Sequence, residues 1–149
     1  MTAENASPAG GAGGKKSIGR YVTATVRILL GLMFLFFGLN GFFNFMPPPK
    51  DMPEHIGAVL GSLTNAGYMK VVCGTMVLSG ALLLSNLFVP LALALLAPII
   101  VGILTFHIFL QPATIAPGIV VTVMELYLAL AYRHAFYPML RPRVTPGAK

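Results

Sequence analysis

The chain has 149 residues, of which 56% are hydrophobic and only 9% are charged, and its mean hydropathy is +0.82. A water-soluble domain of this length cannot carry so much apolar side chain on its surface, which excludes a soluble enzyme, a disordered chain and a disulfide-rich secreted domain. The single cysteine, Cys73, has no partner for an internal disulfide bond and cannot build a multi-cysteine metal site.

The order of polar and apolar segments along the chain predicts a short polar tail followed by an all-α integral membrane four-helix bundle. Residues 1–16 are rich in Gly, Ala and Ser and hold too little apolar side chain to fold, which predicts a disordered cytoplasmic tail. Residues 17–149 are predicted to form a single transmembrane domain. A span needs about 20 mainly apolar residues, because a helix rises about 1.5 Å per residue and the hydrocarbon layer is roughly 30 Å thick. The predicted spans cover about 28–46, 69–88, 90–110 and 117–137.

The fourth predicted span has the shortest apolar core. Only residues 118–132 are apolar throughout, apart from Glu125. To cross the membrane, this span has to include residues 134–137 and let the Arg133 side chain reach back toward the headgroups.

The first connection is long enough to hold a helix of its own. Asp51 can cap the start of that helix, with Glu54 three residues later, and the Asn-Ala-Gly sequence at 65–67 can end it. Apolar side chains follow at helical spacing, namely Ile56, Leu60 and Leu63. We predict a short interfacial helix that lies on the bilayer surface, with an ordered polar loop as the alternative.

A short connection and several small residues indicate how the spans pack. Only a few residues around Asn86 precede Pro90, so the second and third spans are predicted to form a tight antiparallel hairpin. Gly31 and Gly38 lie on one face of the first span and favour close helix packing. A similar small-residue face is predicted on the third span, formed by Ala94, Pro98 and Gly102.

Lys and Arg residues gather at the two ends of the chain. Eight of the ten lie in or beside the terminal segments: Lys15, Lys16, Arg20, Arg27, Arg133, Arg141, Arg143 and Lys149. The other two, Lys50 and Lys70, lie in the first connection. Because basic residues concentrate on the cytoplasmic side of membrane proteins, both termini are predicted to be cytoplasmic. The net charge of +6 therefore indicates membrane orientation and not nucleic-acid binding.

The polar residues inside the spans are predicted to lie at one depth in the outer half of the bilayer. At ~1.5 Å per residue, Asn40, His107 and Glu125 lie about 9, 5 and 10 Å below the outer surface. Asn44 and Gln111 are four residues from Asn40 and His107, so two helices can each present a polar pair. Because an ionisable group in lipid is costly unless it is paired, Glu125 and His107 are predicted to pair inside the bundle.

These five residues form the predicted ligand-binding set, and each has a structural alternative. A carboxyl group in the middle of a span is seldom there for packing, whereas His107 can also bond a headgroup or a loop carbonyl. Asparagines often serve only to join helices, and Cys73 is predicted to be a small buried apolar residue. The sequence holds no metal-ligand spacing, nucleotide-binding loop or catalytic set, so no covalent or motif-bound cofactor is predicted.

Three stretches of sequence resemble the DoxX family of small four-span bacterial membrane proteins. They are RILLGLMFLFFGLNGFFNFMP at 27–47, FVPLALALLAPIIVGILTFHIFLQP at 88–112 and MELYLALAYRHAFYPML at 124–140. The likeness covers most of the chain beyond residue 20, and it implies a multi-pass protein of the bacterial inner membrane. The chain departs from the family at Val77, where members often have an acidic residue, and at Gly102, where they often have asparagine.

Relatives in that family include the membrane subunit of an archaeal thiosulfate:quinone oxidoreductase. The resemblance implies a non-catalytic accessory subunit of a membrane redox complex. In this subunit, His107 and Glu125 would bind a quinone or a similar ligand. Two alternatives stay open: a transporter-like binding module for a small amphipathic molecule, and a structural assembly partner whose polar layer only sets the helix register. The predicted partners are the lipid bilayer and a redox enzyme, with a homo-oligomer as a further alternative.

Overall fold

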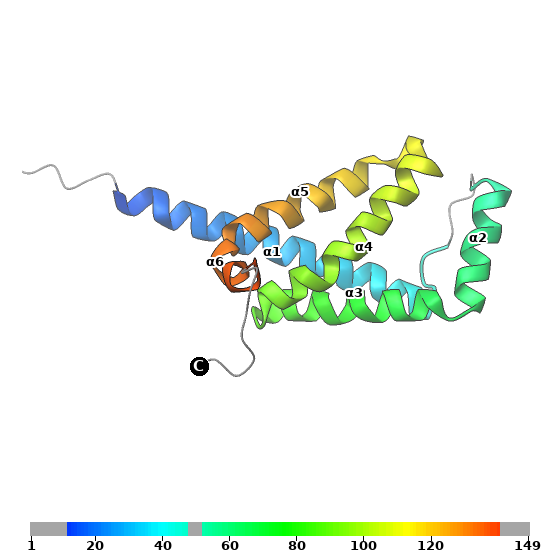
Figure 1. Ribbon diagram of the computed structural model, residues 1–149, viewed down its shortest axis with the longest axis horizontal. Helices are drawn as coiled ribbons and strands as arrows, with labels where there is room; N and C mark the ends of the chain where they lie inside the picture. The colour runs from blue at the N-terminus through cyan, green and yellow to red at the C-terminus, as the bar shows by residue number, and fades with distance from the viewer. Residues whose placement is uncertain (1–11, 48–51, 141–149) are drawn as a thin grey trace, which may run out of the picture.

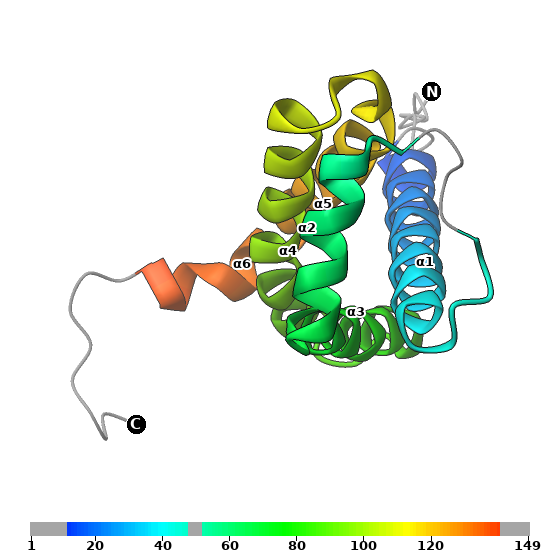
Figure 2. The ribbon, with the colours of Figure 1, turned by 90° about the vertical axis from the view of Figure 1, so that its right-hand side faces the viewer.

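The computed structural model of the protein describes residues 12–47 and 52–140, and within these ranges all regular structure is helical. The helices are α1 (Ala12–Phe43), α2 (Glu54–Asn65), α3 (Tyr68–Ser85), α4 (Val89–Phe109), α5 (Ala116–Ala131) and α6 (Arg133–Phe136), with single 3-10 turns at Pro112–Thr114 (η1) and Tyr137–Leu140 (η2). Figure 1 shows α1, α3, α4 and α5 side by side in an elongated bundle, with α2 across one end. Figure 2 shows α6 turned away from the bundle.

Three helices are long and apolar enough to cross a membrane. The apolar part of α1 covers 26 residues, Ile18–Phe43, and α3 and α4 contribute 18 and 21 residues. Large apolar side chains lie on the outside, where Phe43 is 73% and Phe109 is 77% exposed. Such a surface is favourable only in an apolar surrounding, so the chain is a helical membrane protein.

The segment of the fourth predicted span forms two helices with a bend between them. α5 ends at Ala131, and α5 and the helical segment that begins at Arg133 are bent by 75° at the break. Together this bent pair is apolar and long enough to count as a fourth span. The bend falls where the apolar run meets Arg133 and His134, two side chains that favour the membrane surface over its interior.

α1 is much longer than the predicted first span. It begins at Ala12, so the last five residues of the predicted tail, 12–16, are helical, whereas residues 1–11 lie outside the described residues. Arg20 and Arg27 therefore lie within one helix instead of marking its start. The physical reason is that an arginine side chain has an apolar stem that can follow the helix surface while its charge finds a polar surrounding.

The closest packing in the bundle joins α1 to α3 through glycine. A Cβ atom added at Gly80 would lie 2.8 Å from the carbonyl oxygen of Gly31 and 2.8 Å from the backbone nitrogen of Leu35. One added at Gly38 would lie 2.9 Å from the carbonyl oxygen of Cys73, which is itself buried as predicted. The structural role predicted for Gly31 and Gly38 is therefore confirmed.

The core lies where α1, α3, α4 and α5 meet. It is formed by Leu30, Phe34, Leu83, Val89, Ala92, Leu93, Leu96, Ile100, Val121 and Leu128. The small-residue packing face predicted on α4 is wrong, because Ala94, Pro98 and Gly102 are all exposed and nothing lies within 4 Å of a Cβ atom added at Gly102. α4 instead packs the face that carries Leu93, Leu96 and Ile100 against its neighbours, because larger side chains make more van der Waals contacts between helices in lipid.

The predicted hairpin between the second and third spans is confirmed. Residues 86–88 join α3 to α4, which pack against each other. Asn86 and Phe88 both have left-handed backbone conformations, with φ of 58° and 48°. The Asn86 and Leu87 backbone N–H groups bond to carbonyl groups of the last turn of α3 and close the turn.

A short helix is also present where the first connection predicts one. α2 buries Ile56 completely and packs against α3, while most of its other side chains stay exposed. It ends before Gly67, whose φ of 78° allows the chain to turn into α3. Asp51, the predicted cap, lies outside the described residues.

Candidate functional site

The five predicted ligand-binding residues do not form one site. Asn40, Asn44, His107 and Gln111 lie at or just beyond the ends of α1 and α4, at the end of the bundle that α2 crosses (Figure 1). Glu125 lies in the middle of α5. Glu125 therefore lies apart from the other four residues along the bundle.

Asn40 and Asn44 shape the end of α1. The Met46 backbone N–H donates a hydrogen bond to Asn40 Oδ1 at 2.7 Å, and the Asn44 N–H donates to the Asn40 carbonyl at 2.8 Å. Asn44 has a left-handed conformation with φ of 47°, so the helix ends at Phe43 and not at the predicted Met46. The prediction that both side chains share one helix face is wrong, because Asn44 lies outside the helix.

Replacing these two asparagines is expected to change stability in opposite directions. Asn40→Ala leaves the Met46 N–H without its side-chain acceptor and is expected to cost about 1 kcal/mol of unfolding free energy. Asn44→Gly relieves a left-handed conformation and is expected to gain a few tenths to ~1 kcal/mol. Thermal unfolding in detergent, followed by circular dichroism, measures both. A loss on Asn44→Gly would show that the Asn44 side chain has a partner of its own.

The predicted pairing of His107 with Glu125 is wrong. Within the described part of the chain, neither side chain forms a hydrogen bond, and each has a buried atom without a partner, His107 Nδ1 and Glu125 Oε2. The register explains this separation, because a Cβ atom at Gly118 would meet Leu104 at 3.5 Å. Gly118 and Leu104 therefore lie at the same height in the bundle. Because α4 and α5 run in opposite directions, Glu125 lies toward one end of the bundle from there and His107 toward the other. The two residues are about ten residues, or roughly 15 Å, apart along the helices.

Glu125 is a carboxyl group inside an apolar core. It is only 7% exposed and lies on the same buried face of α5 as Gly118, Val121 and Leu128. Its neighbour on the helix, Thr122, satisfies its own hydroxyl by donating to the Gly118 carbonyl at 2.7 Å. Glu125 thus combines deep burial with an oxygen that lacks a partner, a combination that is rare without a functional reason.

His107 and Gln111 are less enclosed. Both are half-buried, and the His107 ring lies tilted against Phe106 with centroids 5.6 Å apart. α4 ends at Phe109, so Gln111 lies beyond the helix, where its backbone carbonyl accepts hydrogen bonds from Thr114. The predicted pairing of His107 and Gln111 on one helix face is therefore wrong as well.

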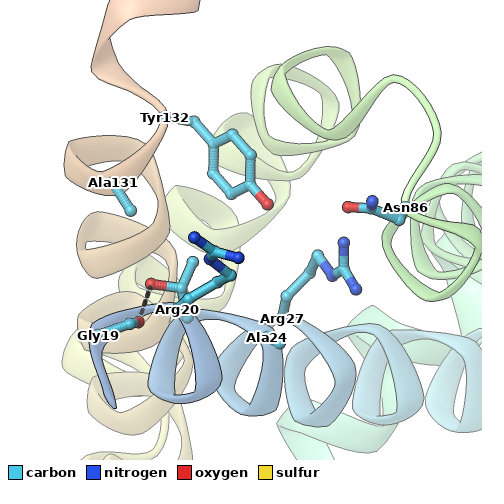
Figure 3. Close-up of a pocket in the computed structure, with 8 residues that line it drawn as sticks. Gly19, Arg20, Ala24, Arg27, Asn86, Ala131 and Tyr132 are labelled. Atoms are coloured by element: carbon cyan, nitrogen blue, oxygen red, sulfur yellow. Dashed lines mark hydrogen bonds between the residues drawn. The ribbon is translucent and has the colours of Figure 1, made fainter. Parts of the chain in front are cut away.

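A pocket that the sequence did not predict lies at the opposite end of the bundle. Its volume is about 430 Å³, and it lies between α1, the α3–α4 turn and the break after α5. It is lined by Gly19, Arg20, Thr23, Ala24, Arg27, Asn86, Ala131 and Tyr132. Figure 3 shows both guanidinium groups entering this space, with the Tyr132 hydroxyl and the Asn86 amide directed toward them.

A signal for this pocket is present in the sequence, but it is also typical of membrane orientation. Arg20, Thr23, Ala24 and Arg27 follow at helical spacing and so share one face of α1. Because the predicted first span starts after Arg27, both arginines are expected to be boundary residues. The residues from the other two segments carry no sequence signal, since only the fold brings them to α1.

Comparison with known proteins finds no matching family model, no matching curated protein and no matching solved structure. The resemblance to the DoxX family therefore stays a prediction. The class of protein defined by the structure is a helical membrane protein with one buried carboxyl group and one arginine-lined pocket among its described residues.

Proposed function

We propose that the protein is a non-catalytic component of the bacterial inner membrane that binds a small lipid-soluble ligand in its helix bundle beside Glu125. The observation that carries this proposal is the burial of Glu125 in an apolar core with one carboxyl oxygen unpartnered. A buried polar group without a partner is costly, and a bound ligand that supplies the missing hydrogen bond removes that cost.

A quinone has the chemistry that Glu125 requires. Its carbonyl oxygen accepts a hydrogen bond from a protonated carboxyl group, and the hydroxyl group of the reduced form donates one to a carboxylate. The apolar core around Glu125, which includes Val121 and Leu128, suits a ring that partitions into lipid. His107 lies too far along the bundle to contact the same ring, so Glu125 is the proposed polar contact.

The redox association in this proposal comes from the resemblance to the DoxX family. In that arrangement the chain is an accessory subunit with both termini in the cytoplasm, and a partner enzyme supplies the electron transfer. A binding module for an amphipathic molecule is the second candidate function, and the separate arginine-lined pocket supports it.

Ligand binding by the purified full-length protein tests the proposal. A short-chain quinone analogue is expected to raise the thermal midpoint of the detergent-solubilised protein and to appear as an adduct in native mass spectrometry. Glu125→Leu, which removes both oxygens, is expected to weaken binding at least tenfold, whereas Glu125→Gln keeps a donor and an acceptor and is expected to weaken binding less. Thr122→Val is the matched control, because the Thr122 hydroxyl is already bonded to its own helix.

Two results would overturn this function. If the wild-type protein shows neither a thermal shift nor an adduct, quinone binding is excluded. If Glu125→Leu binds the analogue as tightly as the wild-type protein, Glu125 is not the contact. A double variant, Glu125→Leu with His107→Phe, that keeps both the fold and the cellular phenotype would instead support the structural assembly partner.

A further inference from the structure

We propose that the arginine-lined pocket is a binding site for a phosphate group. The site lies at the other end of the bundle from α2 and shares no residue with the proposed ligand site at Glu125. This inference is therefore independent of the quinone binding proposed at Glu125, and it concerns the pocket that supports the second candidate function.

The pocket holds two cations and no anion. Arg20 and Arg27 lie two turns apart on one face of α1, and both guanidinium groups enter the pocket (Figure 3). No Asp or Glu is among the eight residues that line it. Arg27 is half-buried, and its Nε atom is buried without a hydrogen-bond partner in the described part of the chain. A buried N–H donor is costly without an acceptor, and an anion at the pocket can supply one to this partly buried guanidinium group.

The position of Arg27 makes it reachable from outside the bundle. Arg27 lies at the level where α3 turns into α4 and where α5 ends, since it lines the pocket together with Asn86 and Tyr132. The pocket supplies the opening through which an anionic group can reach Arg27.

Neutral donors complete the site. The Tyr132 hydroxyl and the Asn86 amide face the two arginines and form no side-chain hydrogen bond within the described residues, so both are free to bond a ligand. Thr23 differs, because its hydroxyl already donates to the Gly19 carbonyl at 2.9 Å and lies 3.1 Å from the Tyr127 hydroxyl. Two planar guanidinium groups with additional neutral donors match the several acceptor oxygens of a phosphate group.

Helix ends account for only part of the positive charge. The C-terminal ends of α3 and α5 meet at the pocket, and each carries roughly half a negative charge. The N-terminal end of α4, at Val89 in the same turn, carries roughly half a positive charge that cancels one of these. The helix ends therefore offset less than one of the two arginine charges, and between one and two positive charges are left. An anion that carries one or two charges, such as a phosphate ester, completes the balance.

Two sources can supply this phosphate group. The pocket lies at the end of the bundle where the basic residues gather, and their distribution predicts that this end faces the cytoplasmic leaflet, which is rich in anionic lipids. A phospholipid headgroup and a soluble phosphate compound share the same chemistry there. Binding measurements with lipid and with inorganic phosphate separate the two sources.

The test uses the full-length protein in detergent, first with phosphatidylglycerol or phosphatidylcholine and then, free of lipid, with inorganic phosphate. Native mass spectrometry counts retained lipid, and thermal unfolding reports on phosphate. We expect either at least tenfold preferential retention of phosphatidylglycerol, which identifies a lipid headgroup, or a rise in thermal midpoint with inorganic phosphate alone, which identifies a soluble compound. Either effect is expected to be lost in Arg20→Gln/Arg27→Gln.

Arg133→Gln is the matched control, because Arg133 lies at the same end of the bundle but does not line the pocket. If the double variant fails to fold, Arg27→Lys is tested instead. Lysine keeps the positive charge but lacks the planar guanidinium group, so this variant is still expected to weaken binding severalfold. The proposal is overturned if the wild-type protein shows neither effect, or if Arg133→Gln loses binding as fully as the pocket variants. In that case Arg20 and Arg27 are boundary residues of the first span that hold no ligand.

Discussion

Gly80→Ala is expected to lower the free energy of unfolding by about 3 kcal/mol, because its methyl group has no space between α1 and α3. The atoms that it would meet are the Gly31 carbonyl oxygen and the Leu35 backbone nitrogen, both 2.8 Å away. Backbone atoms in the middle of a helix cannot move aside as a flexible side chain can. The two helices therefore have to separate, and they lose much of their contact. Thermal unfolding in detergent, followed by circular dichroism, measures the loss.

Gly102→Ala is the control for this substitution. Gly102 also lies within a helix, but nothing is within 4 Å of an added Cβ atom, so alanine is expected to be neutral or to stabilise by up to ~1 kcal/mol. Equal effects of the two substitutions would contradict the close packing of α1 on α3. A loss confined to Gly102→Ala would place a second molecule against the exposed face of α4.

Glu125→Leu is expected to stabilise the ligand-free protein by about 2 kcal/mol and to abolish ligand binding. Leucine removes a buried oxygen that has no hydrogen-bond partner and fills the site with apolar surface, between Val121 and Leu128 on the same face of α5. Stability and binding are then expected to change in opposite directions, as they do where a strained or unsatisfied site is retained for function.

Glu125→Gln separates the two contributions. It retains a polar group of the same shape, so it is expected to weaken binding without the gain in stability. Both variants are compared with the wild-type protein by thermal unfolding in lipid-free detergent. Strong destabilisation by Glu125→Leu would show that the carboxyl group has a partner in the ligand-free protein, and ligand binding would then no longer explain why Glu125 is buried.

Features that depend only on the amino acids within one segment were predictable from the sequence. The helical membrane character, the positions of α3 and α4 and the short turn between them follow from runs of apolar residues and from turn residues such as Asn86. α2 was predicted for the same reason. The predicted start of α1 is wrong because Arg27 interrupts the apolar run without ending the helix, whose N-terminal half contains both Arg20 and Arg27.

The sequence by itself determined that this chain is a membrane protein and where its helices lie along it. Only the tertiary structure decided which face of each helix is buried, how far Glu125 lies from His107, and that Arg20, Arg27, Asn86 and Tyr132 line one pocket. The physical reason is that helices apolar on every side, such as α4, carry no pattern that marks an inner face. Rotation and register are then set by close contacts between helices, which arise only when the segments meet.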